Sequence, residues 1–241
     1  MDELAARLGL EVAQRAMQSP ASTRYLVGIA GVPGSGKTTL AKHVCAIVNA
    51  ELQKLQASSG AGPSSQCPEA VIVGMDGWHY SRAQLSQFPD PQEAKDRRGA
   101  AFTFDSAAFA DFVEQLKAKS AGDEAVLAPS FDHALKDPVA DDVRVESRHR
   151  VVIIEGLYCN CDDGEWARGA RALNERWVVQ VDRQVARERL RVRHVLTGVA
   201  KDEEEALWRA DNNDLPNGDY LMSHLLEPVK RIVSREDQTW V

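Results

Sequence analysis

Residues 31–38 form the clearest chemical motif of the chain. They read Gly-Val-Pro-Gly-Ser-Gly-Lys-Thr and match G-x-x-x-x-G-K-[ST], the phosphate loop of nucleoside triphosphate enzymes. Glycines permit a tight turn with positive φ, so successive backbone N–H groups can point at phosphate oxygens. The lysine of such a loop reaches the β- and γ-phosphates, and the Thr38 hydroxyl can bind Mg²⁺. The predicted nucleotide contacts are Gly31, Pro33, Gly34, Ser35, Gly36, Lys37, Thr38 and Thr39.

Two acidic residues directly follow other apolar runs. Asp76 comes after residues 71–75, and Glu155 comes after residues 151–154. Phosphoryl transfer to an alcohol needs a group that orients the hydroxyl and accepts its proton, and a carboxylate beside Mg²⁺ suits that role. We therefore predict Asp76 as the catalytic base and as a metal ligand, with Thr38 and Glu155 as further metal ligands. A turn or helix-capping role is the alternative interpretation of Asp76.

An arginine-rich helix is predicted after residue 183. Arg187, Arg191 and His194 are spaced i, i+4, i+7 and share one face of this helix. Arginines on a mobile lid can neutralise the charge of a migrating phosphoryl group. We predict Arg187 and Arg191, together with Lys37, as catalytic residues. The alternative is a solvated helix face paired with acids such as Glu188.

Residues for the second substrate are harder to recognise, because each candidate also has a structural interpretation. Trp78 and His79 follow the predicted base and could line a pocket for the phosphoryl acceptor. Arg98, His133 and Asn213 are further polar candidates in loops. Asn213 lies in a polar stretch, residues 211–218, which is predicted to be a turn that contacts the base or the acceptor or simply ends a helix.

Short apolar runs alternate with helical patterns along the chain. The strands are predicted at residues 25–30, 71–75, 125–128, 151–154 and 177–181. Helices are predicted at residues 38–48, 109–119, 184–197, 202–213 and 220–233. This alternation predicts an α/β fold of the P-loop NTPase type: a five-stranded parallel sheet with helices on both faces and a helical arginine-rich lid. Ligands of such sheets gather at the carboxyl ends of the strands, where the phosphate loop, Asp76 and Glu155 are expected.

The length of 241 residues suits one large domain or two small ones, and we predict a single domain that spans residues 1–241. Within it, residues 1–20 are predicted to form an amphipathic N-terminal helix. Residues 58–68 are rich in Gly, Ser and Pro and are predicted to be a flexible loop. Residues 184–200 are predicted to form the lid region.

Composition excludes several classes of partner. A net charge of −7 argues against an extended nucleic-acid surface. No apolar stretch approaches the ~18 residues that a membrane helix needs. Acidic residues in the first 20 positions argue against a secretory or mitochondrial leader. The four cysteines have neither disulfide nor zinc-site spacing, so we expect a cytoplasmic protein.

Taken together, these motifs resemble the uridine kinase, phosphoribulokinase and bacterial pantothenate kinase group of P-loop kinases, in a branch described mainly as ATP-dependent kinases. The resemblance covers nearly the whole chain. It rests on residues 31–38, 75–80, 98–105, 131–138, 153–157, 187–194 and 213–218. In that group, the aspartate matching Asp76 acts as base or lies beside the magnesium, the glutamate matching Glu155 assists metal binding, and the lid arginines hold phosphates.

The sequence therefore predicts an ATP- and Mg²⁺-dependent kinase that phosphorylates a hydroxyl of a nucleoside-, pantothenate- or sugar-like metabolite. Two other classes stay open. A GTPase would need an Asn-Lys-x-Asp type motif, which the sequence lacks. An ATP-binding protein or ATPase that regulates a partner would have no acceptor at all. A homodimer stays open as the assembly.

Overall fold

The computed structural model describes residues 1–58, 67–119, 124–132 and 134–235. The candidate residue His133 lies outside the described residues, as does most of the predicted loop 58–68. Within the described ranges, each helix is too short or too polar to cross a membrane.

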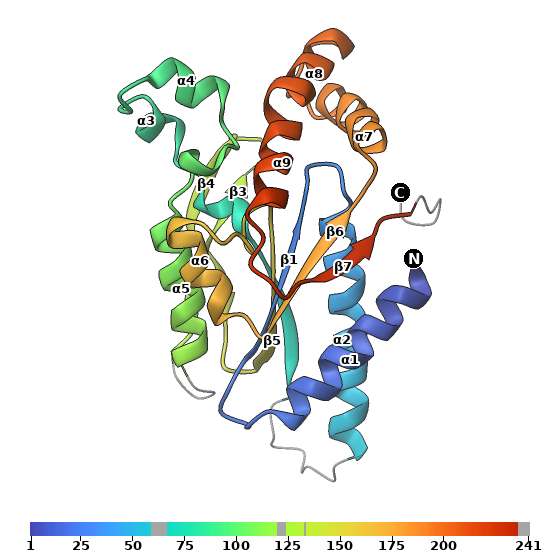
Figure 1. The fold of residues 1–241 in the computed structure, drawn as a ribbon. Coiled ribbons are helices and arrows are strands. Elements are labelled where there is room, and N and C mark those ends of the chain that lie inside the picture. Colours follow the sequence, from blue (N-terminus) through green and yellow to red (C-terminus); the bar gives the residue numbers. More distant parts are fainter. Residues whose placement is uncertain (59–66, 120–123, 133, 236–241) are drawn as a thin grey trace.

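A parallel sheet of five strands forms the centre of the fold, in the order β2-β5-β1-β6-β7 (Figure 1). The strands are β1 (Tyr25–Gly31), β2 (Glu69–Gly74), β5 (His149–Glu155), β6 (Glu175–Gln180) and β7 (Lys230–Val233). Every residue of the central strand β1 is buried, as expected for a strand covered on both faces. Because β1, β5 and β2 are neighbours, the residues that follow their carboxyl ends meet at one edge of the sheet.

Helices cover both faces of the sheet, as predicted (Figure 1). They are α1 (Asp2–Gln18) and α2 (Lys37–Ser58) on one face, and α5 (Ser106–Ala118) and α6 (Gly164–Ala172) on the other. Alternate residues of β1 serve the two cores: Val27 packs with α1 and α2, whereas Leu26 packs with α5 and α6. The predicted N-terminal helix is confirmed, because α1 lays its apolar stripe on α2.

One predicted strand does not belong to the main sheet. Residues 125–128 lie at the start of β3 (Val126–Asp132), which pairs only with β4 (Asp137–Val145) in a separate antiparallel hairpin. Val126 and Ala128 are buried while Leu127 is 39% exposed, so only one face of β3 is covered. This alternation is the mark of a half-exposed strand and not of a central parallel one.

The fifth strand of the sheet comes instead from the C-terminal region, where residues 220–233 were expected to be helical. Helix α9 (Leu215–Ser223) ends before Pro228, and β7 follows. Within β7, Ile232 is buried between two exposed neighbours. Four residues are too few for this alternation to stand out in the sequence.

The remaining elements stand above the carboxyl ends of the strands (Figure 1). They include the 3₁₀ helix η1 (Met75–Trp78), α3 (Arg82–Leu85), α4 (Pro91–Asp96), the 3₁₀ helix η2 (Ala101–Thr103), α7 (Arg183–Leu196) and α8 (Glu203–Arg209). The predicted polar turn near residues 211–218 is wrong: a π-helical turn, Ala210–Asp214, runs directly into α9. Pro216 is accommodated in the first turn of α9, where its missing N–H costs nothing.

Candidate active site

The phosphate loop joins β1 to α2 in a tight turn. The Ser35 N–H donates to the Val32 carbonyl oxygen at 3.0 Å. Gly34 and Gly36 have φ of +80° and +87°, a conformation that residues with a side chain rarely adopt. Any Cβ at Gly31 would lie 2.5 Å from the Ser35 hydroxyl oxygen, so the start of the loop also requires glycine. The predicted nucleotide contacts thus form one compact loop at the end of the central strand.

The Thr38 hydroxyl and Glu155 meet beside this loop. Thr38 Oγ1 donates a hydrogen bond to Glu155 Oε1 at 3.1 Å. Burial raises the pKa of the Glu155 carboxyl above its usual range, the positive charge of Lys37 opposes this rise, and the negative charge of Asp76 adds to it. The charges of Lys37 and Asp76 are therefore close enough to act on Glu155. The order of the strands brings together the four groups predicted for phosphate binding, metal binding and base catalysis.

These oxygen atoms fit a magnesium ion. Glu155 Oε2 is buried and has no hydrogen-bond partner among the described residues, so one carboxylate oxygen is left for a cation. Mg²⁺ prefers hard oxygen ligands and usually keeps several waters or substrate phosphates in its shell. In the described ranges, no three His, Cys, Asp or Glu side chains gather into a cage for a metal. The protein oxygens therefore suit an ion whose remaining ligands come from a nucleotide and from water.

Asp76 is held at this edge by its neighbours in η1. Its side chain is exposed, whereas Met75, Gly77 and Trp78 are buried. A Cβ at Gly77 would lie 2.2 Å from the Pro129 carbonyl oxygen, so η1 lies directly on the backbone of β3. The Trp78 ring packs 5.2 Å from Phe109 in the core. Trp78 therefore anchors η1 in the core, and its 5% exposed side chain presents little surface to an acceptor.

His79 is the candidate beside Asp76 that stays near the surface. Its Nδ1 lies 2.9 Å from the Asp76 carbonyl oxygen. The ring stacks on Phe104 at a centroid distance of 3.8 Å and lies 5.1 Å from Phe131. His79 thus fixes the end of η1 and belongs to a cluster of aromatic rings beside Asp76.

Arg98 holds several loops together. Its guanidinium donates to the Tyr80 carbonyl at 3.0 Å and to Asp137 at 2.8 Å, and it lies 5.5 Å from the Phe131 ring. The buried Asn213 amide donates in turn to the Arg98 carbonyl oxygen at 3.0 Å. Asn213 therefore ties the π-helical turn to the acceptor side. The side chains of Arg98 and Asn213 are thus engaged in internal hydrogen bonds that hold the surrounding loops in place.

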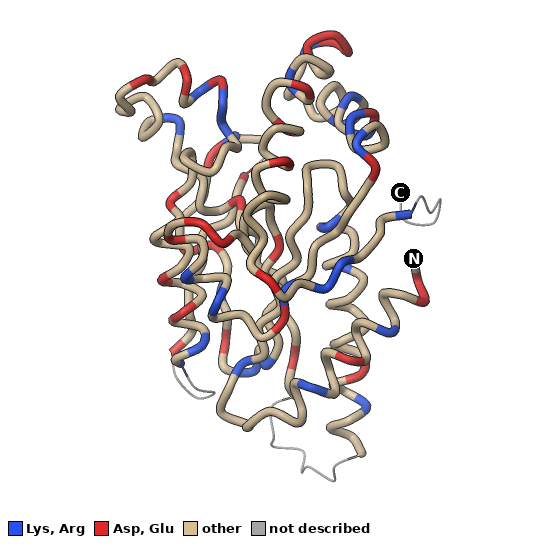
Figure 2. Tube along the Cα trace, in the orientation of Figure 1, with Lys and Arg blue, Asp and Glu red and all other residues tan. Residues whose placement is uncertain are grey.

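The predicted lid arginines pair with acids in this structure. Arg187 makes two hydrogen bonds with Asp211, at 2.7 and 2.8 Å. Arg191 pairs with Glu188 and with Glu203. Figure 2 shows the basic segment of α7 beside the acidic start of α8. His194 does not share their environment, because it is buried and bonds to Asp214 at 2.9 Å.

One arginine that sequence reasoning did not single out contacts the phosphate loop directly. Arg189 Nη1 donates to the Gly34 carbonyl oxygen at 3.1 Å and to Ser234 Oγ at 3.2 Å. The buried residues Ala186 and Leu190 of α7 lie against Gly34. The i, i+4 spacing of Ala186 and Leu190 in the sequence indicates which face of α7 is buried. Ser234 had no such signal, since it follows a strand that was expected to be helical.

Comparison with known proteins decides the family. The sequence model of the phosphoribulokinase / uridine kinase family matches residues 26–166. The chain belongs to this family. The predicted family and the predicted P-loop kinase fold are confirmed, and the chain is a kinase, an enzyme that transfers a phosphoryl group.

Relatives of the chain within curated proteins carry kinase names. The ATP-dependent kinase-like protein notR′ of Aspergillus versicolor is 45% identical over 160 residues, which cover 66% of this chain and 92% of that protein. A candidate uridine kinase of Schizosaccharomyces pombe, C227.14, is 37% identical over 206 residues, which cover 85% of this chain and 81% of that protein. ATP-dependent kinase YFH7 of Zygosaccharomyces rouxii is 33% identical, and the chain spans 55% of its length.

Solved structures agree on the fold of the family. YFH7 from Saccharomyces cerevisiae, a P-loop kinase, aligns with a TM-score of 0.82 over 97% of this chain and 99% of that chain, at 24% identity. A candidate fructose transport system kinase from Silicibacter sp. TM1040 aligns with a TM-score of 0.73 and 28% identity, over 93% of this chain and 98% of that chain.

Proposed function

We propose that this kinase uses ATP with Mg²⁺ and transfers the γ-phosphoryl group to a hydroxyl of a small molecule. The observation that supports this most directly is the meeting of Lys37, Thr38, Glu155 and Asp76 at the neighbouring ends of β1, β5 and β2. A phosphate loop, two oxygen ligands for a cation and an exposed carboxylate are the parts that phosphoryl transfer requires.

The donor side of the reaction falls to the phosphate loop and α7. The loop N–H groups and Lys37 bind the phosphates and hold the γ-phosphoryl group in place. Thr38 and Glu155 would hold a magnesium ion, which would supply positive charge against the phosphates. Arg187 and Arg191 exchange their acidic partners for phosphate oxygens when the lid closes.

The acceptor side falls to η1 and the segments packed around it. Asp76 orients the acceptor hydroxyl and takes its proton. The partly exposed rings of His79 and Phe131 form the adjoining wall, where a flat or ring-shaped acceptor can stack, and the buried Phe104 supports the His79 ring. The proposed acceptor is therefore a nucleoside-, pantothenate- or sugar-like metabolite.

A transfer screen tests this proposal. The full chain is incubated with γ-labelled ATP, Mg²⁺ and a panel that contains uridine, pantothenate, fructose and D-glycerate. Uridine, fructose and glycerate are included because the names of similar proteins refer to them. We expect labelled product with one class of acceptor and none with the Asp76→Asn variant. Equal labelling by wild type and variant contradicts the assigned base, and tight ATP binding without transfer to any acceptor favours the regulatory alternative.

A further inference from the structure

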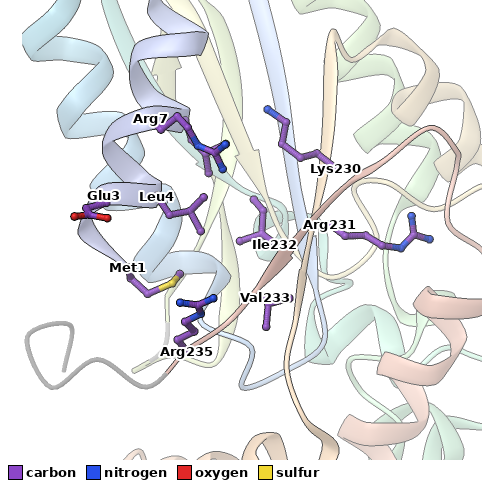
Figure 3. A pocket seen from close by; sticks show the side chains of 10 residues that line it. Met1, Glu3, Leu4, Arg7, Lys230, Arg231, Ile232, Val233 and Arg235 are labelled. Carbon is purple, nitrogen blue, oxygen red and sulfur yellow. The ribbon is translucent and has the colours of Figure 1, made fainter.

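A groove lies away from the phosphate loop, between the N-terminal half of α1 and the edge strand β7 (Figure 3). Its volume is about 360 Å³. Leu4 and Leu8 of α1 and Ile232 of β7 supply apolar surface on its walls. None of the predicted site residues lines it. A hollow of this size is in the range that holds small molecules.

The charges around this groove favour an anion. Four of its ten lining residues are Lys or Arg, and one, Glu3, is acidic. Lys230 is already paired with Glu11 at 2.9 Å, and Arg231 with Glu227 at 2.6 Å. The other two cations, Arg7 and Arg235, form no ion pair with any described residue.

These two arginines bracket the apolar part of the groove. In Figure 3, Arg7 and Arg235 lie on either side of Leu4 and Ile232, and the guanidinium of Arg231 points away. An arginine beside apolar surface is suited to a ligand that has both a charged end and an apolar body. We propose that this groove is a binding site for a small amphipathic organic anion, with Arg7 and Arg235 supplying positive charge at its two ends and an apolar chain lying over Leu4, beneath which Leu8 and Ile232 are buried.

The groove is connected to the phosphate loop through β7. The residue after β7, Ser234, donates its N–H to the Gln180 carbonyl at 2.7 Å. Its hydroxyl accepts from Arg189, whose same nitrogen donates to the Gly34 carbonyl. An anion that contacts Arg235 therefore acts one residue from the Ser234 contact. The site is placed to change ATP affinity, and by linkage ATP changes anion affinity by the same factor.

Calorimetric titration of the full chain with octanoate tests the binding site. Wild-type protein should bind octanoate, while acetate, which lacks the chain, and octanamide, which lacks the charge, should bind at least about tenfold more weakly. Arg7→Gln and Arg235→Gln should each weaken octanoate binding by about tenfold, the loss of one charge-assisted contact. Arg231→Gln is the matched control, because it removes the same charge at a lining position from which the guanidinium points away from the groove and pairs with Glu227.

Three results overturn the proposal. The wild type does not bind octanoate, the double variant with Arg7→Gln and Arg235→Gln binds it as tightly as the wild type, or Arg231→Gln weakens octanoate binding as much as Arg7→Gln and Arg235→Gln do. Ser234→Ala tests the connection, since it should bind octanoate normally but lose the effect of octanoate on ATP affinity. A wild type in which octanoate leaves ATP affinity unchanged contradicts the connection. These measurements need no acceptor, so their failure leaves the kinase proposal in place.

Discussion

Thr38 donates a hydrogen bond to Glu155 across 3.1 Å and so joins the phosphate loop to the end of β5. The two residues are 117 positions apart in the chain. The bond fixes one carboxylate oxygen, while the second is buried without a partner among the described residues. A carboxylate held in this way can bind a cation, but without a cation its buried negative charge destabilises the folded protein.

Replacing Glu155 by Gln should therefore impair the enzyme while stabilising it. The amide keeps the shape of the side chain and can still accept from Thr38, but it binds a metal poorly. We expect Mg²⁺ affinity to fall by about 10- to 100-fold. Burial raises the pKa of Glu155, so removing its charge should raise the Tm of the metal-free protein at pH 8. A gain of about 1 kcal/mol corresponds to about 2–4 °C in a domain of this size.

The pH dependence of that gain has a definite sign. A carboxyl with a raised pKa in the folded state holds its proton more tightly there than in the unfolded chain. Wild-type stability from this group is complete below the unfolded pKa and is lost as pH rises through the folded pKa. The Tm advantage of Glu155→Gln in EDTA should consequently shrink between pH 8 and pH 4. An advantage that is equal at both pH values contradicts the assignment, and Glu204→Gln at an exposed position of α8 serves as control.

Asp76→Asn should separate catalysis from nucleotide binding. The amide cannot accept the acceptor proton, so kcat should fall by about 100- to 10,000-fold, the usual range for a general base. ATP affinity, measured by calorimetry, should change little because the phosphates are held by the loop. Asp96→Asn, at an exposed position of α4, is the matched control. Unchanged turnover in Asp76→Asn would sink the role of base.

Arg187 and Asp211 should have opposite effects on the reaction. Arg187→Gln removes a charge from the transition state, so we expect kcat to fall by about 100-fold or more. Asp211→Asn releases the same arginine from its ion pair and should lower the KM for ATP, with little change in Tm because exposed ion pairs contribute little to stability. Arg183→Gln is the control, because Arg183 lies in the same helix as Arg187 and its substitution breaks a different ion pair, with Asp219 of α9. If Arg183→Gln lost as much activity as Arg187→Gln, the effect would come from the net charge of α7 and not from a contact of Arg187.

Gly34 should not tolerate a side chain. A Cβ there would lie 2.9 Å from the Ala186 carbonyl oxygen, and the φ of +80° adds a backbone cost of about 1–2 kcal/mol. Gly34→Ala should weaken ATP binding by at least about tenfold, since α7 and the loop must separate. Gly164→Ala has a positive φ of +47° but no neighbour within 4 Å, so it should lose Tm without losing ATP affinity. Equal ATP affinities in the two variants would contradict the close contact.

The parts of the site that were predictable are those encoded by local patterns. The phosphate loop lies between an apolar strand and a helix that adjoin it in sequence, and Glu155 directly follows a buried run. Placing the loop and Glu155 together required only the rule that parallel strands end at one edge.

The parts that were not predictable depend on which way a side chain points. Trp78 lies two residues from Asp76, yet it enters the core, because η1 turns at Gly77 against β3. Arg187 and Arg189 are alike in sequence, but only Arg189 reaches the phosphate loop. Likewise, β7 is recognisable only once β6 offers it a hydrogen-bonding edge.

The β3–β4 hairpin has an evolutionary consequence. Its strands pair with each other and not with the main sheet, while its backbone supports the Asp76 turn through Gly77 and its Asp137 binds Arg98. Residues 126–145 can therefore diverge as a module provided that Val126, Ala128 and Val145, which share a core with β1 and β5, are kept. Chimeras that exchange this hairpin between relatives should inherit acceptor preference from the hairpin donor and ATP affinity from the recipient.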